Sequence, residues 1–128
     1  MQLEKKDQVL LALYVEYQKD IPKMSNVTEN VVGLDRDAFK VSIAKLQSEG
    51  YIQQAVVQYG GDGNIPLYAN IDNVMLTVKG IEHIENLVGI DKNSSKDKII
   101  KGLLEFTKEI GLECINNFIL SGFNSILL

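Results

Sequence analysis

The first segment of the chain, residues 3–19, repeats large apolar side chains at helical spacing. The intervals of three, four and seven place them along one stripe of a helix, formed by Leu3, Leu10, Leu13, Tyr14 and Tyr17. The sequence Asp20-Ile21-Pro22 then ends the pattern, because proline disfavours helical geometry in the residue before it. We expect one helix with one buried face, followed by a break.

A short second helix fits between residues 25 and 34. Either Ser25 or Asn26 can serve as its N-cap, because both side chains can accept a hydrogen bond from a free backbone amide. Gly33 is a suitable stop, since glycine readily adopts the left-handed conformation that ends many helices. The apolar residues turned inward would be Val27, Val31 and Val32.

The third helix has signals at both ends. Asp35 can cap it, and Gly50 follows its predicted end near Glu49. Its inward stripe is predicted to consist of Phe39, Ile43 and Leu46. Three helices in this order, joined by short turns, predict a tri-helical core.

The pattern then changes from helix to strand. Residues 51–59 are rich in β-branched and aromatic side chains, residues 60–64 form a glycine-rich turn signal, and residues 67–76 can return as the partner strand. Glycine-rich loops also cradle phosphate, but such loops lead into a helix and this one leads into a strand. We interpret the segment as a β hairpin.

The last third of the chain is predicted to hold two more helices. Thr77 can cap a helix that ends before Asp91, with Ile81, Ile84 and Val88 on one face. Polar residues 91–95 form a predicted hinge, in which Ser94 and Asp97 resemble a capping box. We therefore divide the chain into a domain over residues 1–90, the hinge, and one long helix over residues 96–128. The predicted fold class is α+β, mainly α.

Two local signatures join these elements into a recognisable order. In one, Leu46 is followed by Glu49-Gly50-Tyr51-Ile52; the other is Leu76-Thr77-Val78-Lys79-Gly80. In register with the helices, they make residues 1–88 resemble the YjcQ-like winged-helix family of Gram-positive bacteria and their phages. The resemblance implies a winged helix-turn-helix and a regulatory role. It implies no activity and no catalytic residues.

The C-terminal helix is apolar on all sides from Ile110 onward, and such a helix cannot be left in water. We expect it to pair with the same helix of a second chain and so form a homodimer. The predicted dimer interface consists of Leu103, Ile110, Ile115, Phe118, Ile119 and Phe123.

Two alternatives for this helix stay open. It can pack on its own domain, or it can enter a membrane. The membrane is the less favoured choice, because Glu113 and three asparagines, Asn116, Asn117 and Asn124, are costly there. The pair Ser121-Gly122 can also bend or divide the helix.

Charge is unevenly distributed along the 128 residues, whose formal net charge is −4. Between Tyr51 and Asp91 the only Lys or Arg is Lys79, against five acidic residues, Asp62, Asp72, Glu82, Glu85 and Asp91. A surface that binds nucleic acid normally clusters Lys and Arg. The middle of the chain therefore argues against strong DNA binding.

The third helix nevertheless holds the candidate DNA contacts. Arg36, Lys40 and Lys45 lie at its start and sides, where they could meet phosphates. Its outward stripe carries no Arg, Asn or Gln able to read base edges with two hydrogen bonds. We expect phosphate contacts with little sequence readout, and an ordinary solvated helix face is the alternative.

Other chemistry is sparse in the sequence. Cys114 stands alone in an apolar segment and is predicted to be a small buried side chain. His83, the only histidine, lies off the apolar stripe of its helix and has no evident partner. We expect no metal, no cofactor and no enzyme activity, and the charged start of the chain favours the cytoplasm over secretion.

Two functions follow as hypotheses. The first is a dimeric phage or mobile-element transcriptional regulator that contacts DNA mainly through phosphates. The second is a protein interaction module that binds a host or phage protein without binding DNA.

Overall fold

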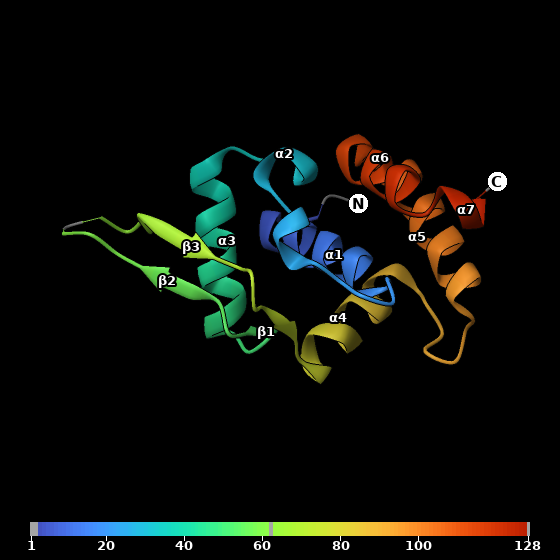
Figure 1. Cartoon of the computed structure of the whole chain (residues 1–128), viewed down its shortest axis with the longest axis horizontal. Helices are drawn as coiled ribbons and strands as arrows, with labels where there is room; N and C mark the ends of the chain where they lie inside the picture. The colour runs from blue at the N-terminus through green and yellow to red at the C-terminus, as the bar shows by residue number, and fades with distance from the viewer. Residues whose placement is uncertain (1–2, 62, 128) are drawn as a thin grey trace.

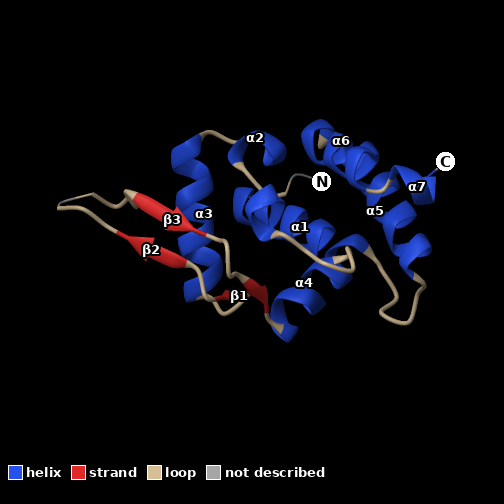
Figure 2. Ribbon diagram, in the orientation of Figure 1, coloured by secondary structure: helices blue, strands red, loops and turns tan. Residues whose placement is uncertain are grey.

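A computed structural model of the chain describes residues 3–61 and 63–127. Asp62 of the predicted hairpin turn and Leu128 of the predicted C-terminal helix lie outside the described residues. The described part is mainly helical with two short antiparallel ladders (Figure 2), which confirms the predicted α+β, mainly α class. The β hairpin projects at one end of the molecule, and the C-terminal helices lie at the other (Figure 1).

Helix α1 (Lys5–Tyr17) is the centre of the molecule and packs against α2, α3, α4 and α6. From Val9 to Val15 each side chain is at most 1% exposed. The sequence predicted one buried face, but residues 9–15 are buried on all sides, and only the ends of the helix, at Lys5 and Tyr17, are exposed. This agrees with the unbroken apolar run over residues 9–15, which is typical of a helix inside a core.

The second helix begins later than predicted. Residues Met24–Asn26 form a 3₁₀ turn, and α2 spans only Glu29–Val32. Thr28 is the N-cap, with its hydroxyl accepting from the amide of Val31. The predicted caps Ser25 and Asn26 are therefore wrong, because both belong to the 3₁₀ turn. Gly33 ends the helix with φ of 82°, as predicted.

Helix α3 (Arg36–Ser48) confirms the predicted cap and the predicted core stripe. The Asp35 carboxylate accepts from the amide of Ala38 at 2.7 Å, and Gly50 has φ of 82° after the helix ends. The residues expected to face inward are all buried, namely Phe39, Ile43 and Leu46. The local end signals and the apolar pattern agree here, so the sequence located the helix correctly.

The predicted hairpin is present, but it is divided into two ladders. Strand β1 (Ile52–Gln53) pairs with β4 (Met75–Leu76), and β2 (Val56–Gln58) pairs with β3 (Tyr68–Asn70). The division lies at Gln54, whose φ is +69°. Next to it, the Gln47 side chain accepts from the Ala55 amide at 2.7 Å and donates to the Ala55 carbonyl at 2.9 Å. A side chain of α3 thus makes the two hydrogen bonds to the Ala55 backbone that a neighbouring strand would make in a continuous sheet.

Helix α4 (Val78–Val88) follows β4 directly and packs against it. Thr77 caps it as predicted, because its hydroxyl accepts from the Gly80 amide at 3.0 Å and donates to the Gly50 carbonyl at 2.6 Å. Gly80 faces the backbone of Tyr51 so closely that a β-carbon would overlap the Tyr51 carbonyl oxygen. These contacts fix the helix on the end of the hairpin.

The C-terminal segment is not one long helix, and this prediction is wrong. It forms α5 (Lys96–Ile110), α6 (Glu113–Gly122) and α7 (Asn124–Leu127). Gly111 adopts φ of 80° and ends α5, so the chain turns and α6 packs back against α5. The N-cap of α5 is Ser95, which accepts from the amide of Lys98, and not the predicted Ser94.

The predicted dimer interface belongs instead to the core of this chain. Leu103, Ile115 and Ile119 are 0% exposed, Phe123 is 5% exposed, and Ile110 and Phe118 pack partly buried against the same core. Helix α6 covers α1 and α2, so the apolar surface that required a partner finds it within the chain. Packing on the own domain, which the sequence left open, is the arrangement observed.

Polar contacts hold the C-terminal helices together. Asn116 on α6 donates to the Leu104 carbonyl and to the Thr107 hydroxyl of α5, each at 3.0 Å. At the other end of α5, a hydrogen bond from Lys96 lowers the pKa of the exposed Asp20 carboxyl.

In the part of the chain that the structure describes, no helix is both long and apolar enough to cross a membrane.

Candidate functional site

A surface groove of about 530 Å³ lies over the outward face of α3. Helix α3 contributes the floor, the start of α1 forms one wall, and Ile65 of the hairpin loop contributes to the other. The residues that line it are Glu4, Lys5, Lys6, Asp37, Ala38, Val41, Ser42, Lys45 and Ile65. The groove therefore joins three segments that are far apart in the sequence.

The structure does not gather the three predicted DNA contacts at this groove. The Arg36 side chain is 77% exposed, and its Nε lies 3.5 Å from Glu29 Oε1. The Lys40 side chain is only 18% exposed, with Nζ 3.8 Å from Asp37 Oδ1 and 3.5 Å from the Leu67 carbonyl of the hairpin. Of the three, only Lys45 lines the groove.

The acidic residues of the groove already have cationic neighbours. Lys6 lies 2.7 Å from Glu49 and 3.8 Å from Glu4, and its hydrogen bond to Glu49 raises the pKa of the ammonium group. Asp37 lies beside Lys40. Two groove lysines, Lys5 and Lys45, are exposed and form no ion pair within residues 3–61 and 63–127.

The sequence does not identify Lys5 and Lys6 as groove residues. Nothing in their spacing shows that this end of α1 lies beside α3. The long-range contact between Lys6 and Glu49, 43 residues apart, is what brings them to the groove.

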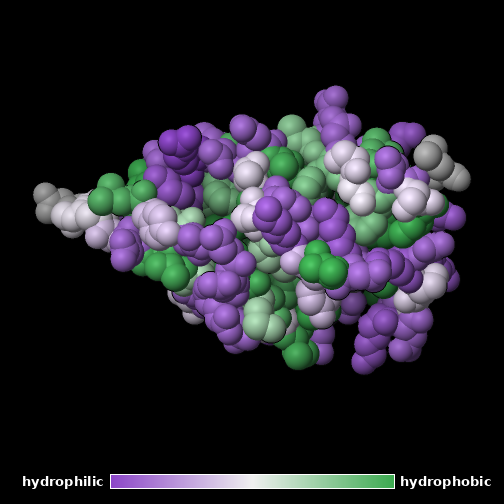
Figure 3. All heavy atoms as spheres, in the orientation of Figure 1, coloured by the Kyte–Doolittle hydropathy of each residue, from purple (hydrophilic) through white to green (hydrophobic). Residues whose placement is uncertain are grey.

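The hairpin residues that the structure describes carry no charged side chain beside the groove. Within residues 52–61 and 63–71 there is no Asp, Glu, Lys, Arg or His. Val57 and Ala69 pack on the core, and Tyr59 and Leu67, each two positions farther out, share that side because side chains alternate along a strand. Figure 3 shows hydrophobic residues at the surface of this end of the molecule.

We define the hairpin tip surface as Tyr59, Ile65 and Leu67. Their exposed fractions are 56%, 44% and 72%, which are large for apolar side chains of this size. Leu67 lies across the backbone of Gly60, where an added β-carbon would overlap it. The surface thus places three large apolar groups in solvent next to an open groove.

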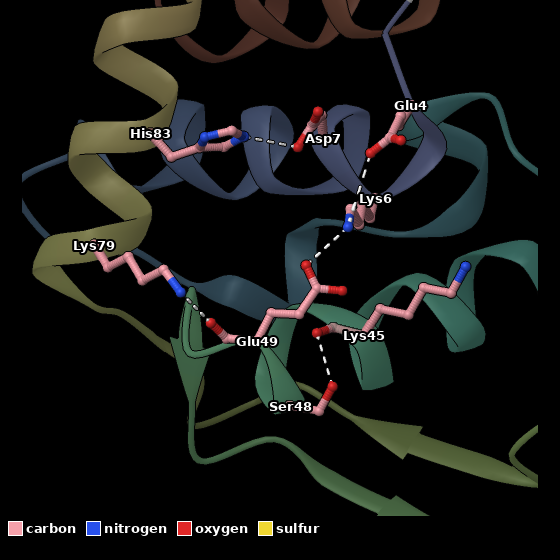
Figure 4. A network of polar contacts seen from close by, with 8 residues as sticks. All are labelled: Glu4, Lys6, Asp7, Lys45, Ser48, Glu49, Lys79 and His83. Atoms are coloured by element: carbon pink, nitrogen blue, oxygen red, sulfur yellow. Dashed lines mark hydrogen bonds and ion pairs between the residues drawn. The ribbon is translucent and has the colours of Figure 1, made fainter.

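A polar network behind the groove fixes the relative positions of α1, α3 and α4 (Figure 4). His83 Nε2 lies 3.0 Å from Asp7 Oδ1, and Lys79 Nζ donates to the Glu49 carbonyl at 2.7 Å. The Tyr51 ring lies 4.9 Å from the His83 ring and 4.7 Å from Lys79 Nζ. His83 has a partner, Asp7, which the sequence did not reveal because 76 residues separate them.

This network is a structural support and offers no metal site. Among residues 3–61 and 63–127, no three His, Cys, Asp or Glu side chains are grouped so that they could hold a metal ion. Asp7 and His83 connect α1 to α4, and Lys6 and Glu49 connect α1 to α3. They set the position of the groove wall that carries Lys5.

The prediction for Cys114 is wrong, because the side chain is exposed. It lies on the first turn of α6, where a β-carbon added to Gly33 would come within 3.0 Å of its sulfur. Ile115 and Ile119 face the core, and Cys114, one residue before Ile115 on the helix, is on a different face.

Comparisons with protein-family models, with curated proteins and with solved structures gave no match to this chain. The resemblance to the YjcQ-like winged-helix family therefore stays a prediction.

Proposed function

We propose that the chain is a winged-helix module that binds another protein in the groove over α3. The order of α1, α2 and α3, the hairpin and α4 supports the fold part of the proposal. The two junctions that suggested it from the sequence, at Gly50 and at Thr77, are joined by the hydrogen bond from Thr77 to the Gly50 carbonyl.

The main support for a protein partner is the exposed apolar character of the hairpin tip surface. In a DNA-binding winged helix, the hairpin normally contacts the DNA backbone or minor groove, and phosphates require cations there. This hairpin instead carries Tyr59, Ile65 and Leu67 in solvent and no cation in the described residues between Ile52 and Ile71. Exposed aromatic and aliphatic groups beside a groove are typical of protein interfaces.

The test is affinity capture from the native host with tagged full-length protein and two variants. We expect a stoichiometric protein partner that Leu67→Glu loses, because a charge replaces the most exposed apolar group of the tip. The matched control is Leu120→Glu, which changes a 42% exposed leucine on α6, at the other end of the molecule (Figure 1). Equal capture by all three proteins, or by none, would reject the hairpin tip surface as the binding surface.

The second candidate is the phage or mobile-element transcriptional regulator that contacts DNA phosphates. The observation in its favour is that Lys5 and Lys45 line the groove and form no ion pair with any residue that the structure describes. Any dimer in such a regulator would have to use a surface other than the buried face of α6. Polarisation with labelled genomic fragments near roughly 50 mM salt, where the electrostatic contribution to binding is strong, would detect this activity.

A further inference from the structure

We propose that the groove binds an acidic, amphipathic protein segment. Its carboxylates would pair with Lys5 and Lys45, and its apolar side chains would rest on Val41 and the hairpin tip surface. This inference rests on the proposed function and adds the chemistry of the partner.

The charge of the groove favours an acidic segment. Asp37 has Lys40 at 3.8 Å, and Lys6 is shared between Glu49 at 2.7 Å and Glu4 at 3.8 Å. Among the described residues, the lining then has two lysines without an ion pair, Lys5 on α1 and Lys45 on α3, against one carboxylate, Glu4, that shares its lysine. Complementary charges steer a partner and fix its register.

The apolar lining determines what else the segment must carry. Ala38 and Val41 lie on the floor and Ile65 on the hairpin side, with Leu67 and Tyr59 next to it. A purely acidic chain would leave these groups in water. An amphipathic helix with apolar residues at every third or fourth position can cover them and direct its carboxylates to the two lysines.

A DNA backbone fits the same lining less well. It would have to cover the exposed apolar side chains of the hairpin tip surface, which offers no cation to its phosphates. Phosphate binding gains its affinity from several cations acting together. Duplex DNA is therefore an outcome of the test and not part of the proposal.

The experiment measures polarisation with full-length protein and a fluorescein-labelled peptide of about 16 residues. The peptide carries leucine or phenylalanine at helical i, i+3, i+4 and i+7 spacing and aspartate or glutamate elsewhere. A second peptide replaces every acid by lysine, and a third probe is a DNA duplex of similar length. The variants are the double change Lys5→Glu and Lys45→Glu, and a matched double control, Lys98→Glu and Lys101→Glu, at exposed lysines of α5.

We expect the acidic peptide alone to bind, and the groove variant to bind it at least about tenfold more weakly because two attractions become repulsions. The α5 control should stay within about twofold of the original protein. No binding of the acidic peptide, equal binding of the lysine peptide, or an unchanged groove variant would overturn the inference. Duplex binding that only the groove variant loses would overturn it in favour of nucleic acid.

Failure here is distinguishable from failure of the proposed function. If the captured host partner still depends on Leu67 while the acidic peptide does not bind, the module binds a protein of different chemistry. If capture and peptide binding both fail, the protein-binding function itself is rejected.

Discussion

Gly80 shows how a single residue controls the position of a helix. Its α-carbon lies against the Tyr51 carbonyl, so Gly80→Ala must displace α4 from the end of β1. We expect the free energy of unfolding to fall by about 2–3 kcal/mol, as in other overpacked sites. Urea titration followed by circular dichroism would measure it.

The control for this prediction is Gly102→Ala on α5. No atom outside the local helix backbone lies within 4 Å of a β-carbon built there. Alanine is the better helix former, so the free energy of unfolding should rise by roughly 0.5–1 kcal/mol. If both variants lose stability equally, the contact between Gly80 and Tyr51 is not what holds α4.

At this scale the sequence predicted the residues whose partners are local. Asp35 and Thr77 accept from amides three residues later, and that spacing can be read directly from the chain. It misplaced the cap at Thr28, because Ser25 and Asn26 offer the same chemistry nearby. It could not find the contact between Asp7 and His83, since their meeting depends on how α1 and α4 pack.

Among the elements, the hairpin depends on one side chain of α3. Gln47 makes both backbone hydrogen bonds of Ala55 at the point where the two ladders separate. We expect Gln47→Ala to destabilise the protein by about 1–3 kcal/mol, because a buried amide and carbonyl lose their partners. In the Gln47→Ala variant, the amides of Ala55 and β2 should exchange faster than in the original protein, and the amides of α1 should change less.

Gln58→Ala is a suitable control, since Gln58 is an exposed residue of β2 with no side-chain hydrogen bond in the described part of the chain. It should leave exchange at Ala55 unchanged. If Gln47→Ala also leaves it unchanged, the outer ladder is held by the strand pairing alone.

The C-terminal helices show where element prediction fails. An isolated glycine destabilises a helix by only about 1 kcal/mol relative to alanine. Gly111 alone therefore does not predict the end of a helix when apolar residues continue on both sides of it. The sequence suggested a division at Ser121-Gly122, and α6 does end at Gly122. The larger turn at Gly111 depends on α6 finding α1 and α2, which no local pattern encodes.

For the whole molecule, the burial of the C-terminal helices in their own chain predicts a monomer, whereas the sequence alone predicted a homodimer. Removing residues 112–128 would uncover α1 and α2, so we expect an insoluble chain or one without cooperative unfolding. Light scattering on the full-length protein should give a monomer. A folded, monomeric truncation together with a dimeric full-length protein would restore the tail as a dimer interface.

The sequence identified a surplus of apolar groups in the tail but not where they go. Burial in the same chain and burial in a second chain satisfy the same hydrophobic requirement, so composition does not separate them. The groove was equally hidden, because its lining comes from α1, α3 and the hairpin. What the sequence did predict was the absence of cations on the hairpin, which is a matter of composition alone.

The central position of α1 has a consequence during synthesis. It is made first, yet α6 covers it, and about a hundred residues separate Tyr17 from Phe123. At roughly 5–20 residues per second, a ribosome needs roughly 5 to 20 seconds to deliver that cover. During this interval the apolar run over residues 9–15 emerges without its final neighbours. Chaperones therefore have a transient binding segment in the nascent chain, although the folded molecule buries that run.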